Sequence, residues 1–176
     1  ETPVMQSEWN EFIQQAGGEA VEKASKKIVV KLLPEIEGAK LNQEEAYRLT
    51  ISSKGIQVDA TTEKGVYWAL QTLRQLERKG KRSSFQGCEI VDWPAFKIRG
   101  FMHDVGRSYL ALDELKKEIE ILSRYKINVF HWHLTENQAW RLESKIFPML
   151  NDSVNMTRLQ GKYYTIEEAK ELVEFC

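Results

Sequence analysis

The sequence predicts an α/β protein in two parts, a small α+β layer over residues 1–93 and parallel strands joined by helices over residues 94–176. Short alternating apolar segments surround a single helical pattern in the first part. In the second part the order is strand, helix, strand, helix, which is typical of parallel βαβ units. The two parts meet at Asp92-Trp93-Pro94-Ala95, because Pro94 restricts Trp93 to extended geometry.

In the first part, residues 9–27 are weakly patterned and predict a loop and a short surface helix. Residues 28–33 form a β-branched run that predicts a buried strand ending at Pro34. Residues 47–51 and 56–60 alternate between apolar and polar around a Lys54-Gly55 turn, and this pattern predicts a hairpin.

The spacing of the apolar residues changes later in the first part. Apolar residues recur at spacings of three and four over residues 63–79, which predicts a helix, and Lys79-Gly80-Lys81 is a typical helix end. Residues 87–91 predict one more short strand.

In the second part, residues 97–105 and 127–134 predict two strands, with a helix between them that Asp113 caps. Thr165 caps a further helix. Such a repeat suits an α/β barrel or a doubly wound sheet. A barrel of eight units needs about 250 residues, so residues 94–176 would supply about a third of one at most. The helix between the two predicted strands has an apolar face that consists of Leu115, Ile119, Leu122 and Tyr125.

Composition excludes several classes of protein. Of the 176 residues 42% are hydrophobic, which is enough for a core and argues against disorder. The 25 Lys and Arg balance 26 Asp and Glu without long runs of one sign, so neither a nucleic acid nor an anionic membrane is an expected partner. No apolar run reaches the ~20 residues that a membrane helix needs. Cys88 and Cys176 form no disulfide framework.

The carboxyl end of the chain favours a fragment of a longer polypeptide, because the helix that Thr165 opens has no stop signal before Cys176. The start at Glu1 without a methionine fits a processed precursor and a trimmed polypeptide equally well.

Candidate site residues follow the apolar part of each predicted strand, because ligands bind beyond the carboxyl ends of parallel strands. This rule selects residues 104–107 and 135–138. An interpretation as helix caps and ordinary loop residues explains the same positions equally well.

Two other patterns suggest chemistry. His131 and His133 share one face of a strand and could form half of a metal site, but His103 is the only further histidine, so no metal is predicted. A metal-dependent hydrolase built on these histidines remains an alternative. Asp113-Glu114 resembles the acid pair of a glycosidase, although its place at a helix start favours capping.

Residues 97–107 (KIRGFMHDVGR) and 128–141 (NVFHWHLTENQAWR) resemble the first two barrel strands of family 20 glycoside hydrolases, the β-N-acetylhexosaminidases. Residues 62–73 resemble the helix of the small domain that precedes the barrel in this family, and residues 90–94 resemble its linker. The resemblance implies a small α+β domain followed by the first part of a truncated (β/α)8 TIM barrel.

The resemblance also implies an activity. Family members remove terminal β-linked N-acetylglucosamine or N-acetylgalactosamine from glycans with retention, the sugar's own acetamido oxygen acting as nucleophile. No cofactor is expected, the partner is the terminal N-acetylhexosamine of a glycoconjugate, and the location is periplasmic or extracellular.

By the same resemblance, Arg99 holds the 3- and 4-hydroxyls of the sugar, and the alternative for Arg99 is an ion pair with Asp104. Glu136 takes the place of an acid near the active site, and Asp104 and His133 give supporting hydrogen bonds. The family's catalytic Asp-Glu pair follows the fourth strand and is expected beyond Cys176, so the isolated chain is expected to be inactive.

One further expectation follows from an incomplete barrel. Its open strand edges should be covered by a dimer partner or by the rest of a longer chain. A non-catalytic module that binds glycan, or merely braces a barrel, remains the third functional alternative.

Overall fold

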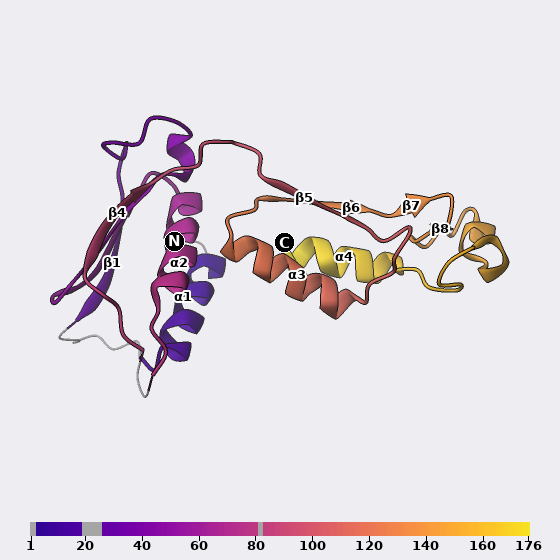
Figure 1. The fold of residues 1–176 in the computed structure, drawn as a ribbon, viewed down its shortest axis with the longest axis horizontal. Helices are drawn as coiled ribbons and strands as arrows, with labels where there is room; N and C mark the ends of the chain where they lie inside the picture. The colour runs from indigo at the N-terminus through magenta and orange to yellow at the C-terminus, as the bar shows by residue number, and fades with distance from the viewer. Residues whose placement is uncertain (1–2, 19–25, 81–82) are drawn as a thin grey trace. The chain divides into compact units, whose positions relative to one another are not determined.

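The computed structural model describes residues 3–18, 26–80 and 83–176 (Figure 1). The chain folds into two compact units, Glu1–Lys97 and Ile98–Cys176. This division lies four residues beyond the one that the sequence predicts. Each unit has a hydrophobic core of its own.

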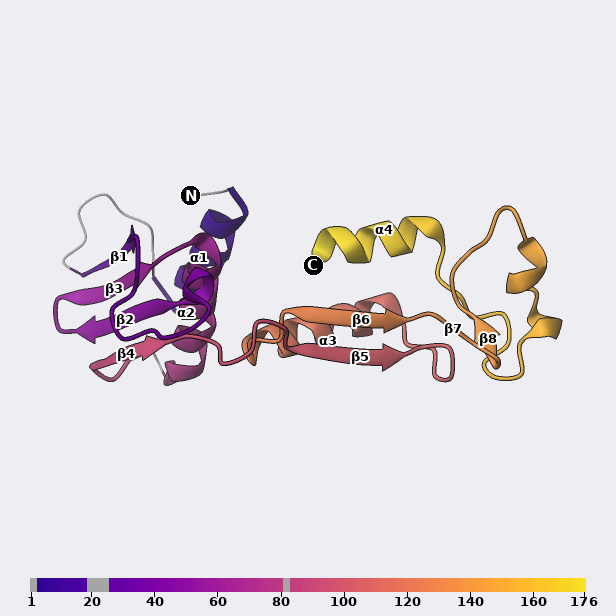
Figure 2. The same cartoon turned by 90° about the horizontal axis from the view of Figure 1, so that it is seen from above.

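The first unit is a four-stranded sheet in the order β1-β3-β2-β4, which Figure 2 shows from above. The predicted hairpin is confirmed, because β2 and β3 pair antiparallel with Ser52 opposite Gly55. β1 runs parallel to β3 and β4 runs antiparallel to β2. The strands are β1 (Lys27–Leu32), β2 (Tyr47–Ser52), β3 (Gly55–Ala60) and β4 (Cys88–Asp92).

Helices α1 (Pro3–Gln15) and α2 (Glu63–Leu76) cover one face of this sheet (Figure 1). The amphipathic pattern of α2 places Leu70 and Leu73 against the buried residues of β2. An ion pair of 2.9 Å between Arg74 Nη2 and Glu8 Oε2 links the two helices. The predicted helix therefore forms and packs as the sequence indicates.

Three expectations for this unit were wrong. Trp9 and Phe12 of α1 lie in the core, not on a surface helix; residues 19–25 of the same predicted segment lie outside the described residues. β1 is an edge strand with Val29 40% and Leu32 59% exposed, because β3 alone pairs with it among the described strands. Helix α2 ends at Leu76, before the helix end predicted at Lys79-Gly80-Lys81, because the backbone of Glu77 already has an extended conformation.

In the second unit, β5 (Gly100–Asp104) and β6 (Val129–His133) pair in parallel, and α3 (Leu112–Arg124) connects them. The predicted parallel βαβ unit is confirmed. α3 and α4 (Ile166–Phe175) lie on the same side of the two strands (Figure 1) and enclose a core of Val105, Leu115, Tyr164 and Leu172. After β6 come the short strands β7 (Thr135–Glu136) and β8 (Ala139–Trp140), and then the 3-10 turns Pro148–Asn151 and Ser153–Asn155. A further 3-10 turn, Gln43–Glu45, precedes β2 in the first unit.

Helix ends in this unit agree with the sequence in part. The Thr165 cap is confirmed, since its hydroxyl accepts from the Glu168 backbone N–H at 3.1 Å. Asp113 is not a cap, because Ala111 holds that position and the Glu114 carboxylate accepts from the Ala111 N–H at 3.4 Å. Tyr125 is 74% exposed and outside the core, since α3 has already ended at Arg124. Among the described helices, we find none with the length and apolar character to cross a membrane.

Two buried tyrosines predict a loss of stability at alkaline pH. Tyr47 donates to Asp92 Oδ2 at 2.9 Å, and Tyr164 donates to the Leu110 carbonyl at 2.5 Å. Burial raises the pKa of both phenols above the value of about 10 that they have in an unfolded chain. Because the folded pKa is the higher one, this stability is present below about pH 10 and decreases as the pH rises above it.

An alkaline titration followed by tyrosinate absorbance and circular dichroism checks this prediction. The absorbance of Tyr47 and Tyr164 should appear only together with unfolding, and Tyr47→Phe and Tyr164→Phe should each remove part of that late signal. Ionisation of all six tyrosines near pH 10 in a chain that stays folded would contradict it.

Candidate functional site

The carboxyl ends of β5 and β6 bring three titratable side chains together. Asp104 is the last residue of β5, and His133 lies opposite it at the end of β6. Glu136 follows three residues later in β7. One ligand atom from each of the three lies within 4.8 Å of the others. This is the edge at which parallel α/β architectures bind ligands.

Arg107 joins the two carboxylates of this edge. Its Nη1 lies 2.9 Å from Asp104 Oδ2 and its Nη2 lies 2.9 Å from Glu136 Oε1. The Arg107 backbone N–H also donates to Asp104 Oδ1 at 3.1 Å. Because the Arg107 side chain remains 54% exposed, it can still meet a ligand from solvent. We call Asp104, Arg107, His133 and Glu136 the carboxyl-edge cluster.

Glu136 accepts contacts on both of its carboxylate oxygens. His133 Nε2 lies 3.2 Å from Oε1, the same oxygen that Arg107 contacts, and the Asn137 backbone N–H donates to Oε2 at 3.3 Å. These contacts fix the direction of the carboxylate. The cluster therefore presents an exposed guanidinium held between two oriented acids, an arrangement suited to binding a polar, uncharged ligand through hydroxyl groups.

Gly106 makes the close approach of the two strand ends possible. A Cβ at this position would lie 2.8 Å from Glu136 Cβ and 3.2 Å from Asp104 Oδ1. Any larger residue would therefore push β7 away from the end of β5.

Arg99 lies at the opposite end of β5. It precedes the first residue of the strand, and its Nε donates to the Lys126 carbonyl at 2.6 Å. The structure thus brings together Asp104 and Glu136, which the strand-end rule selects, and His133, which the resemblance adds, but Arg99 lies at the other end of the strand. The sugar-binding role of Arg99 stays a prediction, and the ion-pair partner of Asp104 is Arg107.

The two neighbouring histidines do not converge on a common set of ligands. The rings of His131 and His133 are 5.9 Å apart between centroids, and His131 is exposed. Among the described residues, only Asp104 and Glu136 come near enough to share an ion with His133, and Arg107 already lies against both carboxylates. His103 instead lies 2.8 Å from Glu118 Oε2 through Nδ1.

Sequence reasoning missed two arginines. Arg107 stood inside the selected segment 104–107, and its place after β5 was the signal that could have identified it. Arg141 is fully buried and has no such signal in the sequence, because its partners are backbone carbonyls from distant segments.

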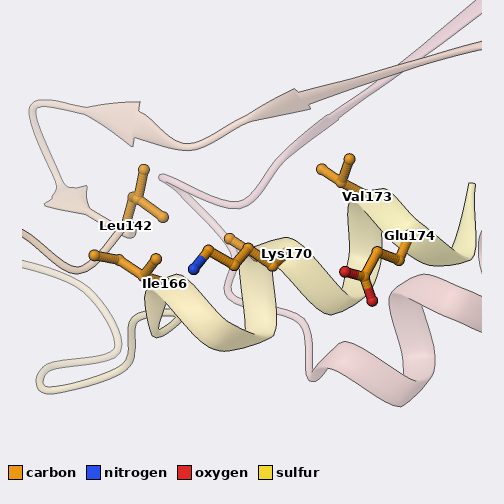
Figure 3. A pocket seen from close by; sticks show the side chains of 6 residues that line it. Leu142, Ile166, Lys170, Val173 and Glu174 are labelled. Atoms are coloured by element: carbon orange, nitrogen blue, oxygen red, sulfur yellow. The ribbon is translucent and has the colours of Figure 1, made fainter.

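A shallow apolar groove lies elsewhere in the second unit, along α4 (Figure 3). No member of the carboxyl-edge cluster lines it. The side chains that line it come from α4 and the residue after Arg141: Leu142, Ile166, Ala169, Lys170, Val173 and Glu174.

Comparison with protein families accounts for both units. The family model described as glycosyl hydrolase family 20, catalytic domain, matches residues 96–176, and that of glycosyl hydrolase family 20, domain 2, matches residues 4–93. The chain belongs to glycosyl hydrolase family 20. Its carboxyl-edge cluster lies wholly within the catalytic-domain match.

Relatives of this family 20 chain include two bacterial enzymes. A beta-hexosaminidase of Porphyromonas gingivalis is 40% identical over 148 residues, which is 76% of this chain and 19% of the relative. A beta-hexosaminidase of Vibrio furnissii is 36% identical over 148 residues, which is 76% of this chain and 24% of the relative. The chain thus spans a quarter or less of the length of these two relatives.

Solved structures agree in fold. The beta-N-acetylhexosaminidase of Bacteroides fragilis superimposes with a TM-score of 0.80 at 30% identity, over 99% of this chain and 36% of that one. The GH20 exo beta-N-acetylglucosaminidase of Vibrio harveyi, solved with N-acetylglucosamine, gives 0.78 at 26% identity over 98% and 29%. The predicted fold class, a small α+β domain followed by the opening of a TIM barrel, is confirmed, and the doubly wound alternative is not supported.

Proposed function

We propose that this family 20 chain is the amino-terminal part of an exo-acting β-N-acetylhexosaminidase, which releases terminal β-linked N-acetylglucosamine or N-acetylgalactosamine from glycans. The observation that carries the proposal is the carboxyl-edge cluster within the match to the family 20 catalytic domain. The names of the relatives in both comparisons support the same substrate class.

Within this proposal, Arg107 holds the sugar hydroxyls in place of Arg99. The guanidinium of Arg107 is half exposed at the carboxyl edge of the strands, where ligands bind, whereas Arg99 lies at the amino edge. A planar guanidinium can donate to two adjacent hydroxyls while Asp104 and Glu136 keep it oriented. Glu136, Asp104 and His133 then act as positioning residues.

The proposed chemistry is retaining and substrate-assisted. The acetamido oxygen of the bound sugar attacks its anomeric carbon, an acid protonates the leaving oxygen, and a neighbouring aspartate stabilises the oxazolinium that forms. The residues of this chain bind and orient the terminal sugar for that step. No cofactor enters the proposed route.

The 176-residue chain by itself is expected to hydrolyse no substrate. Its single Asp-Glu sequence, Asp113-Glu114, lies in the first turn of α3, where Glu114 contacts the Ala111 backbone. Asp113-Glu114 therefore does not supply the family's acid pair at the carboxyl-edge cluster. An assay of the purified chain with an aryl β-N-acetylglucosaminide checks this prediction, and turnover blocked by a thiazoline inhibitor would contradict it.

The same assay on the polypeptide at its full encoded length tests the proposed function. We expect release of N-acetylglucosamine with the β configuration at the anomeric carbon, inhibited by the thiazoline. Saturable sugar binding without turnover would favour the glycan-binding alternative. Turnover that requires added zinc would favour the metal-dependent alternative. Recovery of the polypeptide from the periplasm or the medium would test the location proposed with this function.

A further inference from the structure

Arg141 is a fully buried arginine that the proposed chemistry does not use. It directly follows β8, and its exposed fraction is 0%. Burial lowers the pKa of its guanidinium, because desolvation disfavours the charged form. A buried guanidinium is tolerated only where its donors are satisfied.

Backbone carbonyls accept hydrogen bonds from the N–H donors of the Arg141 guanidinium. An arginine side chain has five N–H donors, and five carbonyl oxygens surround this one. Nε donates to Val105 at 3.0 Å, Nη2 to Gly106 at 3.3 Å and Arg158 at 2.8 Å, and Nη1 to Leu159 at 2.9 Å and Lys162 at 2.6 Å.

These carbonyls come from two segments that are far apart in the sequence. Val105 and Gly106 directly follow β5, whereas the other three acceptors lie in the connection before α4. The backbone of Arg141 adds a third link, since its N–H donates to the Leu134 carbonyl at 2.9 Å, just after β6. Arg141 therefore ties the ends of both strands to one loop.

The same carbonyls lie next to the carboxyl-edge cluster. A Cβ on Gly106 would lie 2.8 Å from Glu136 Cβ, and Arg107 is the next residue. Arg141 Nη2 thus binds the Gly106 carbonyl, and Glu136 leaves no room for a Cβ at Gly106. A shift of Gly106 would move the backbone that carries Arg107.

We propose that Arg141 is a positioning residue for the sugar site: its bonds to the Val105 and Gly106 carbonyls hold Arg107 at the place where it bridges Asp104 and Glu136. The expected effect on KM rests on the proposed function. The expectation that Arg141 fixes the backbone of residues 105–107 does not depend on that function.

Arg141→Lys in the polypeptide at its full encoded length tests the inference. Lysine keeps the charge but has three donors, so at least two of the five carbonyls lose a partner. We expect KM for an aryl β-N-acetylglucosaminide to rise about tenfold or more with a much smaller change in kcat. The matched control Arg124→Lys changes an exposed arginine of α3 and should leave both constants unchanged.

A lower kcat with an unchanged KM, which a smaller fraction of folded protein would also produce, would overturn the inference. Should Arg141→Lys fail to fold, Gly106→Ala tests the placement of the same segment, because its Cβ would meet Glu136 Cβ at 2.8 Å. An unchanged KM in Gly106→Ala would then overturn the inference as well.

Amide hydrogen exchange separates this inference from the proposed function. In folded Arg141→Lys, exchange at Val105 and Gly106, whose N–H groups donate to the His133 carbonyl, should accelerate about tenfold or more, with little change in α3. Uniform acceleration over the second unit would overturn the inference. If the unmodified polypeptide shows no hexosaminidase activity, the proposed function fails while this exchange pattern still decides the role of Arg141.

Discussion

Replacing Arg107 with alanine in the polypeptide at its full encoded length is expected to lower kcat/KM for an aryl β-N-acetylglucosaminide by about 10²- to 10³-fold. The guanidinium bridges Asp104 and Glu136 and is exposed to a ligand, so the variant removes bonds to the sugar and leaves two acids without their partner. Hydrogen bonds to charged groups contribute about 1.5–3 kcal/mol each, and each 1.4 kcal/mol corresponds to about a factor of ten. Steady-state kinetics measures the change.

Arg99→Ala is the comparison for this prediction. The Arg99 side chain donates to the Lys126 carbonyl at the amino end of the strands, so its loss should affect stability more than KM. A large rise in KM for Arg99→Ala with a normal KM for Arg107→Ala would show that Arg99 holds the sugar hydroxyls, as the family resemblance implies.

Gly65→Ala is expected to destabilise the first unit by about 2 kcal/mol. A Cβ on Gly65 would lie 2.4 Å from the Ala46 carbonyl oxygen and 3.1 Å from Ala60 Cβ, so α2 must move away from the sheet. Overpacking of this kind costs about 1–3 kcal/mol or more, and the better helix propensity of alanine offsets about 1 kcal/mol of that cost. Urea unfolding followed by circular dichroism measures the free energy of unfolding.

Gly87→Ala is the matched control in the same unit. Its nearest neighbour would be the Ile51 carbonyl oxygen at 3.4 Å, an ordinary contact, and Gly87 is exposed. We expect a change within about 0.5 kcal/mol. Equal effects of the two variants would mean that the approach of α2 to the sheet is not what requires glycine at position 65.

Local pattern was enough to predict most of the fold. The hairpin of β2 and β3, helix α2 and the Thr165 cap each depend on residues that are neighbours in the sequence, so their sequences contain the signal. The parallel pair β5 and β6 follows from the order of strand, helix and strand, each of which has its own local pattern. β1 could not be assigned to an edge in the same way. Its β-branched run resembles a central strand, and only the pairing of the whole sheet leaves one side of it open.

The candidate site was predicted in part for the same reason. Asp104 and Glu136 follow from the rule that parallel strands end at one edge, the family resemblance adds His133, and the structure brings the three together. Arg99 was chosen by resemblance rather than by position, and it lies at the other end of β5. Arg141 depends on carbonyls that only the folded loops place around it, which no local pattern contains.

The proposed sugar site depends most on Arg107 as the group that binds the sugar hydroxyls. Its most direct test compares kcat/KM for two aryl β-N-acetylglucosaminides, one with the 4-hydroxyl and one without it, in the unmodified polypeptide and in Arg107→Ala. We expect the unmodified polypeptide to discriminate strongly between the two substrates, and Arg107→Ala to treat them alike, because the partner of the hydroxyl is gone. Full discrimination in Arg107→Ala would contradict the account.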